Sequence, residues 1–240
     1  MRAGSAAGRR ALRAFVRDTG PMSALKAVLF DMGDTLFERD GGSQGIVAAA
    51  RELGAEVDPA AAARVWEEIQ ARARTPEELA KGRDLSPEAH WAAWTALYRP
   101  AEVFAAGMAD ALYQRETAAE HWRPYPDTLP TLQALRGRGV PVCVVSDAGF
   151  DVRPFFRHHG LSELVDAFVI SFEEGATKPA PQLFTRACER LAVSPGEALM
   201  VGDNWRSDGG AVDAGLTCLL LPATPPGQPH RLERVLALVA

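Results

Sequence analysis

The chain has 240 residues and a formal net charge of −5 at pH 7. A chain of this length holds one sizeable core and a smaller inserted module. Its acidic balance leaves no basic excess for a phosphate backbone or an anionic membrane surface, so neither nucleic acid nor a membrane is an expected partner. No stretch approaches the roughly 18 apolar residues that a transmembrane helix requires.

The number and spacing of the cysteines indicate which cellular compartment to expect. The three cysteines, Cys143, Cys188 and Cys218, lie within apolar runs. Their odd number and wide spacing match neither a zinc site nor a disulfide framework, so we expect reduced thiols in a cytoplasmic protein.

Residues 1–21 differ in composition from the rest of the chain. They are rich in Arg, Ala and Gly, and the pair Arg9-Arg10 is not followed by the long apolar segment of a secretory signal. Two interpretations remain open: a disordered tail before a domain that starts at Met22, which we favour, and an organellar transit peptide.

Five apolar runs predict the strands of a sheet. Four of them end abruptly in polar residues, as expected of buried strands that carry polar side chains at their carboxyl ends. In chain order the runs are 26–30 before Asp31, 140–145 before Ser146-Asp147, 165–170 before Ser171, 198–201 before Gly202-Asp203, and 217–221.

Helical patterns separate the later runs. They predict helices over 127–138, 180–191 and 208–214, the first and last of which stop at Gly139 and Gly215. Strands that alternate with helices indicate an α/β fold with a doubly wound parallel sheet. Such sheets bind ligands beyond the carboxyl ends of their strands, which is where the polar residues of this chain fall.

The stretch 39–119 is Ala-rich and periodic at helical spacing. Thr75 and Ser86 are each followed by a Pro and then by Glu, a pattern typical of helix N-termini. We therefore expect a helical cap domain over 39–119, inserted into a core domain made of residues 22–38 and 120–240.

Aromatic residues of this insertion are expected in its core. Trp91, Trp94 and Tyr98 lie three and four residues apart, which predicts one shared buried face, with ligand stacking as the alternative. Trp205 is different, because it follows Asp203 in a loop at the ligand edge of the predicted sheet.

Four polar clusters occur in an order that resembles the motifs of the haloacid dehalogenase (HAD) superfamily of hydrolases. Residues 31–36 (Asp-Met-Gly-Asp-Thr-Leu) resemble its first motif, Asp-x-Asp-x-Thr-Leu, and Ser146 closes a strand as the second motif requires. Lys178-Pro179 is similar to the third motif and residues 202–208 to the fourth. The resemblance covers residues 25–221 and implies a HAD-like Rossmannoid core, in the subgroup whose helical cap lies between motifs one and two.

The resemblance implies roles for the acidic residues. Asp31 would attack phosphorus through one carboxylate oxygen and form an aspartyl-phosphate that water later hydrolyses. Its other oxygen, the backbone carbonyl of Gly33 and the carboxylate of Asp203 would hold Mg²⁺, a hard cation that prefers oxygen ligands. Asp208 would order metal-bound water, and a second role compatible with this one is to cap the helix that starts there. The implied partner is a small phosphorylated substrate, and the implied assembly is a monomer or homodimer.

Ser146 and Lys178 would hold the transferred phosphoryl group, by hydrogen bond and by charge. Of the 26 Lys and Arg residues, only Lys26, Lys81 and Lys178 are lysines, so a Lys here indicates a need for a compact ammonium group. Because Lys178 follows a loop and belongs to no apolar pattern, we expect its replacement to remove activity and leave stability nearly unchanged.

One position departs from the family pattern. In phosphatases of this family the residue two after the nucleophile is an Asp that protonates the leaving oxygen, and here that residue is Gly33. General acid help of this kind is worth ~10²–10⁴ in rate. Asp34, one place later, would replace the acid if Gly33 turned the loop differently through a positive φ, and otherwise has a structural role in the loop.

Three alternatives to a phosphatase follow from that departure. The missing acid would suit a binding or regulatory module with weak catalysis, although such a module has no use for Asp31 as a nucleophile. A 2-haloacid dehalogenase, which breaks a carbon–halogen bond, carries an aromatic residue at the position of Gly33 and needs no metal. A phosphonate hydrolase carries a small residue there and uses a cap lysine, which in this chain could only be Lys81. We favour a Mg²⁺-dependent phosphatase.

Overall fold

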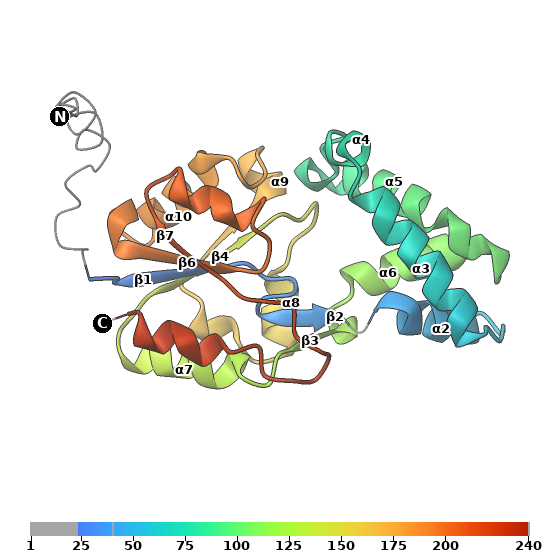
Figure 1. The fold of residues 1–240 in the computed structure, drawn as a ribbon, viewed down its shortest axis with the longest axis horizontal. Coiled ribbons are helices and arrows are strands. Elements are labelled where there is room, and N and C mark those ends of the chain that lie inside the picture. Colours follow the sequence, from blue (N-terminus) through green and yellow to red (C-terminus); the bar gives the residue numbers. More distant parts are fainter. Residues whose placement is uncertain (1–23, 40, 240) are drawn as a thin grey trace, which may run out of the picture.

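The computed structural model describes residues 24–39 and 41–239, so the tail expected over residues 1–21 lies outside the described residues. A five-stranded parallel sheet forms the centre of the fold, with the strand order β5-β4-β1-β6-β7 (Figure 1). This arrangement confirms the predicted doubly wound α/β fold. The strands are β1 (Ala27–Phe30), β4 (Val142–Ser146), β5 (Ala167–Ile170), β6 (Ala198–Gly202) and β7 (Thr217–Leu220).

Strand β1 lies at the middle of the sheet, with Phe30 aligned to Val144 on one side and to Val201 on the other. From β1 the chain proceeds through β4 and β5 to one edge, and then returns to β6 and β7 on the opposite side of β1. The direction of winding therefore reverses next to β1. In open α/β sheets ligands bind at such a switch point, beyond the carboxyl ends of the strands.

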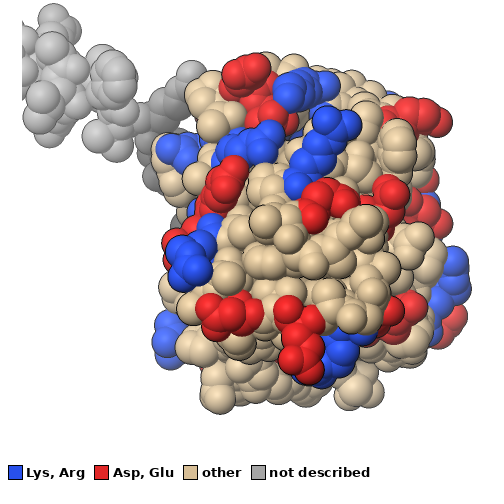
Figure 2. Space-filling model, turned by 90° about the vertical axis from the view of Figure 1, so that its right-hand side faces the viewer, with Lys and Arg blue, Asp and Glu red and all other residues tan. Residues whose placement is uncertain are grey.

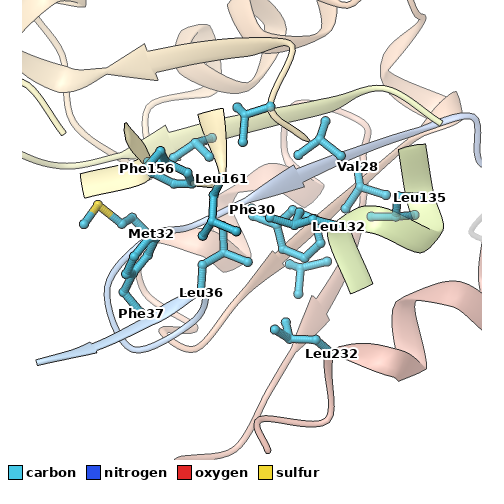
Figure 3. Close-up of a cluster of buried hydrophobic side chains, with 14 of the residues drawn as sticks. Val28, Phe30, Met32, Leu36, Phe37, Leu132, Leu135, Phe156, Leu161 and Leu232 are labelled. Carbon is cyan, nitrogen blue, oxygen red and sulfur yellow. The ribbon is translucent and has the colours of Figure 1, made fainter. Parts of the chain in front are cut away.

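Helices cover both faces of the sheet because successive residues of β1 point to opposite sides. Phe30 enters one buried cluster, which Figure 3 shows between the sheet and its helices, and Leu29 enters the other. The first face is covered by α7 (Thr128–Gly137) and α8 (Arg153–His158), and the second by α10 (Pro181–Arg190). Short elements complete the layers: η4 (Ser162–Leu164), α9 (Ser171–Glu174), η5 (Pro195–Glu197), η6 (Asp208–Val212) and η7 (Leu232–Ala237).

Three predicted elements differ by two or more residues from those observed, one of them being the strand predicted over 140–145, which starts at Val142. The helix predicted over 208–214 is the shorter 3₁₀ element η6, because Gly209 and Gly210 disfavour a regular α-helix. The strand predicted over 165–170 starts only at Ala167, because Val165 still terminates η4. The three cysteines are free thiols. None of the helices in the described part of the chain is long and apolar enough to cross a membrane.

Between β1 and β4 the chain forms the helical segment, by which we mean residues 41–121. Two short antiparallel strands, β2 (Phe37–Arg39) and β3 (Trp122–Pro124), join it to the sheet (Figure 1). The segment has a buried apolar cluster of its own, built around residues such as Ile46 and Leu97. Its elements are α2 (Gly42–Glu52), α3 (Pro59–Ala73), α4 (Pro76–Leu79), η1 (Arg83–Leu85), α5 (Pro87–Tyr98), η2 (Arg99–Val103), α6 (Met108–Thr117) and η3 (Ala119–His121).

Local sequence explains where these helices begin. The Thr75 hydroxyl accepts a hydrogen bond from the backbone N–H of Glu78, and Ser86 caps α5 in the same way. The prediction of one buried aromatic face was wrong for Trp91, whose side chain is exposed, and right for Trp94 and Tyr98. The buried stripe of α5 includes His90, so Trp91 is rotated away from it by about 100°.

The surface of the helical segment carries both positive and negative side chains. Figure 2 looks onto this end and shows Lys and Arg interspersed with Asp and Glu, with uncharged surface between them. A basic face of the kind that follows a phosphate backbone is absent from this side of the described residues.

Candidate active site

Three neighbouring strands bring polar residues to one edge of the sheet. Asp31 directly follows β1, Ser146 is the last residue of β4, and Asp203 directly follows β6. Since β4, β1 and β6 are adjacent and parallel, these residues meet at the switch point. The apolar runs that end in polar residues predicted this edge correctly.

Lys178 lies within this group and is buried. Its Nζ donates hydrogen bonds of 2.7 Å to Asp31 Oδ1 and of 2.7 Å to Asp208 Oδ1. The two carboxylates, Asp208 more than Asp31, hold the pKa of Lys178 above its ordinary value, although burial opposes them. We expected replacement of Lys178 to leave stability nearly unchanged, and the burial of Lys178 and its two ion pairs contradict the reason for that expectation. The loop before α10 folds inward over the strand ends.

The backbone of Lys178 is held by a residue that the sequence analysis left without a role. Asp147 accepts a hydrogen bond of 2.9 Å from the Lys178 N–H through Oδ1. Burial is the main cause that raises the pKa of Asp147, and Lys178 opposes it. Its place directly after Ser146, at the end of a buried strand, was the signal that could have identified it.

Three carboxylates form a set of oxygen donors. Asp31, Asp203 and Asp208 each offer an oxygen, and these atoms lie within 4.8 Å of one another. Burial raises the pKa of Asp31 to about 8; Lys178 opposes the shift, and the carboxylates of Asp208 and Asp203 add to it. Burial, Asp34 and Asp208 raise the pKa of Asp203 to about 6. One ammonium group does not offset three carboxylates, so this donor set fits a hard divalent cation.

Asp208 does not act as a helix cap. Its carboxylate is fully buried and accepts hydrogen bonds from Lys178 Nζ and from the backbone N–H of Asn204 at 3.0 Å. The N-cap residue of η6 is Ser207, and its side chain accepts no hydrogen bond from the first backbone N–H groups of η6. Of the two roles predicted for Asp208, the capping role is therefore wrong.

The loop after Asp31 makes a tight turn in which Asp34, and not Gly33, has a positive φ. Asp34 has a φ of 56°, in the left-handed region, and its N–H donates to the carbonyl of Phe37 at 2.8 Å. Gly33 does not have a positive φ, and a Cβ built on it would lie 3.5 Å from the Trp122 ring. We expected Asp34 to replace the general acid if Gly33 had a positive φ, and Gly33 does not have one. The role of Asp34 stays a prediction.

The helical segment is packed directly against the loops of this edge. A Cβ built on Gly149 would lie 2.3 Å from the Cβ of His90 and 2.8 Å from the carbonyl oxygen of Ser86. The Ser171 hydroxyl donates to the carbonyl of Asp84 at 2.5 Å. The loop after β4 and the start of α9 thus touch η1 and the start of α5.

Gly149→Ala is expected to lower the free energy of unfolding by about 1–3 kcal/mol, because the added methyl group has no space against a helix backbone. Urea unfolding followed by circular dichroism measures this. Gly137→Ala is the matched control, because a Cβ built on Gly137 meets nothing within 4 Å. Equal stability of the two variants would contradict the close approach.

Fold and comparison together place the chain among the α/β hydrolytic enzymes. A family model of haloacid dehalogenase-like hydrolases matches residues 25–215, and the chain belongs to this family. The resemblance drawn from the four clusters is thereby confirmed.

Relatives support this assignment over most of the chain. A glyceraldehyde 3-phosphate phosphatase from Methanopyrus kandleri is 32% identical over 206 residues, which cover 80% of this chain and 82% of that protein. A ribulose-1,5-bisphosphate 5-phosphatase from Halopiger xanaduensis is 30% identical over 206 residues, covering 81% of this chain and 83% of that protein.

Solved structures agree on the fold. A dehalogenase with an intermediate complex aligns with a TM-score of 0.69 at 23% identity, covering 90% of this chain and 98% of that one. A HAD phosphatase from Thermococcus onnurineus aligns with a TM-score of 0.57 at 24% identity, covering 90% and 99%. At these identities the likeness concerns the fold alone.

Proposed function

We propose that the protein is a Mg²⁺-dependent phosphatase that acts on a small phosphorylated metabolite through an aspartyl-phosphate at Asp31. The observation that carries the proposal is the buried contact of Lys178 with Asp31 and Asp208, next to Asp203. It combines a carboxylate nucleophile, a fixed positive charge and a set of oxygen donors at one point. Phosphoryl transfer needs each of these.

In the first step an Asp31 oxygen attacks phosphorus, the bond from phosphorus to the leaving oxygen breaks, and the phosphoryl group is transferred to Asp31. In the second step water attacks this aspartyl-phosphate, releasing inorganic phosphate and restoring the carboxylate. Lys178 and Ser146 would hold the phosphoryl oxygens in both steps. No general acid stands at Gly33, so the leaving oxygen departs with little help.

The metal would be held by Asp31, Asp203 and the backbone carbonyl of Gly33, with Asp208 orienting its water ligands. A bound Mg²⁺ supplies positive charge that reduces the repulsion between the anionic nucleophile and the anionic ester. The donor set of Asp31, Asp203 and Asp208 supports this part of the proposal.

A phosphorylated sugar is the substrate class that we favour. Two relatives that cover about four-fifths of this chain are named for glyceraldehyde 3-phosphate and ribulose-1,5-bisphosphate. We further propose that residues 39–119 act as a cap domain over a core of 22–38 and 120–240, in a cytoplasmic monomer or homodimer. The separate apolar cluster of the helical segment supports this division.

The phosphonate hydrolase alternative receives no support. Lys81 is the only lysine of the helical segment, and its Nζ pairs with Glu78 at 2.6 Å on the exposed end of α4. A Schiff-base lysine is desolvated and lies at the reacting centre.

Hydrolysis of p-nitrophenyl phosphate and of glyceraldehyde 3-phosphate tests the proposal. Activity in Mg²⁺ is expected to fall by at least about tenfold in excess chelator and to return when Mg²⁺ is restored, because the metal offsets the negative charge of the site. Asp31→Asn is the negative control. Full activity in chelator, or turnover that survives Asp31→Asn, would overturn it.

A further inference from the structure

The geometry points to Tyr113 as the residue through which the helical segment recognises a hydroxyl group on the leaving group of the substrate. This inference rests on the proposed phosphatase and adds to it a residue that determines specificity for the hydroxyl groups of its substrate. Tyr113 lies on α6, and its position follows from two contacts on either side of it.

The first contact places Tyr113 near the loop that follows Ser146. Its hydroxyl lies 3.0 Å from Nδ1 of His90. The His90 ring, in turn, meets the ring of Phe150 edge-on with centroids 5.0 Å apart, and the Cβ of His90 is packed against Gly149. One ring therefore separates Tyr113 from the loop of β4.

The second contact places the same face of α6 near the loop that follows Asp31. Glu116, one turn beyond Tyr113, accepts hydrogen bonds of 2.9 and 3.0 Å from Nη1 of Arg39. Arg39 ends β2, the strand to which the nucleophile loop leads, and its guanidinium lies 5.1 Å from the centre of the Trp122 ring. A Cβ built on Gly33 would lie 3.5 Å from the same Trp122 ring.

Tyr113 is thus joined through His90 to the loop of β4, and Glu116, one turn beyond it on α6, is joined through Arg39 and Trp122 to the region of the β1 loop. These adjacent strands carry Ser146 and Asp31 at their ends. The side chain of Tyr113 is half-buried, whereas its partner His90 is buried. A half-buried polar side chain at this place can contact the part of a substrate that extends away from the phosphoryl group.

The hydrogen-bonding role of the phenol follows from His90. Nε2 of His90 faces Asp84 Oδ1 at 3.8 Å, and the negative charge of that carboxylate favours the tautomer with its proton on Nε2. Nδ1 is then an acceptor, so the phenol donates its proton to His90. The lone pairs of the Tyr113 oxygen remain to accept a hydrogen bond, and the complementary group on a neutral leaving group is a hydroxyl.

The test compares sn-glycerol 3-phosphate with propyl phosphate, which share an alkyl leaving oxygen and differ in their hydroxyl groups. The wild-type protein in Mg²⁺ is expected to have the higher kcat/KM for the glycerol ester. Tyr113→Phe is expected to lower the ratio of the two kcat/KM values by about tenfold, the effect of one lost hydrogen bond. His90→Phe keeps a ring against Phe150 but removes the acceptor that orients the Tyr113 phenol, so it is also expected to lower this ratio.

Tyr98→Phe is the matched control, since it removes a buried phenol that donates to Glu116 at 3.3 Å and is expected to keep the wild-type ratio. An unchanged ratio in Tyr113→Phe, or an equal change in Tyr98→Phe, would overturn the assignment. So would a wild-type protein that hydrolyses both esters equally well. A wild-type protein that hydrolyses no phosphate ester refutes the phosphatase itself, which is a separate outcome.

Discussion

Lys178→Met is expected to lower both activity and stability. Loss of the ammonium group removes the fixed charge at the phosphoryl oxygens, which should reduce kcat/KM by ~10²–10³-fold. It also leaves the carboxylates of Asp31 and Asp208 without their shared partner in a buried place. Breaking a buried ion pair of this kind costs about 3–5 kcal/mol of unfolding free energy.

Urea unfolding in excess chelator measures the stability effect, because added Mg²⁺ would offset part of the uncompensated charge. Lys26→Met is the matched control, since Lys26 is exposed and forms a surface ion pair with Glu197. A Lys178→Met protein with the same unfolding free energy and the same turnover as the wild type would contradict the assignment of Lys178 to the active site.

Gly33→Asp is expected to raise the hydrolysis of alkyl phosphates by ~10²-fold or more, because it restores a general acid at the leaving oxygen. The backbone at Gly33 admits a Cβ, which would lie at ordinary contact distances of 3.5 Å and 3.6 Å from the Trp122 ring. Aryl phosphates, whose leaving groups need no proton, should gain little. The rate of the variant should therefore depend less steeply on leaving-group pKa than that of the wild type.

Gly33→Asn is the control that adds the same volume without an acid. If the wild type already cleaves alkyl phosphates with a flat dependence on leaving-group pKa, an acid is present elsewhere. Loss of that flat profile in Asp34→Ala would then identify Asp34, and its persistence would exclude it.

The fold and the main acidic residues were predictable because their signals are local. An apolar run that ends in Asp31 or Ser146 identifies both a strand and the side chain at its end. Since the carboxyl ends of parallel strands meet at one edge, the sequence also predicted that these residues lie close together.

The contacts that the sequence did not predict join elements far apart in the chain. Lys178 is 147 residues from Asp31, and neither its burial nor its hydrogen bond to Asp147 follows from any local pattern. The same holds for His90, whose partners Tyr113 and Phe150 belong to α6 and to the loop after β4. Trp91 was misplaced because spacing gives the relative positions of residues around a helix and not which side faces the core.

The paired strands β2 and β3 determine where the helical segment can be replaced by the corresponding segment of a relative. Arg39 stands directly opposite Trp122, so the helical segment leaves and re-enters the sheet domain at neighbouring points about 5 Å apart. In its chain path the whole segment is therefore comparable to the loop of a β-hairpin, and its contacts with Gly149 and Ser171 are the ones that an exchanged segment must reproduce. If residues 39–119 act as the proposed cap, recombination between relatives at this pair of positions is expected to transfer substrate preference and leave the groups at the strand ends in place.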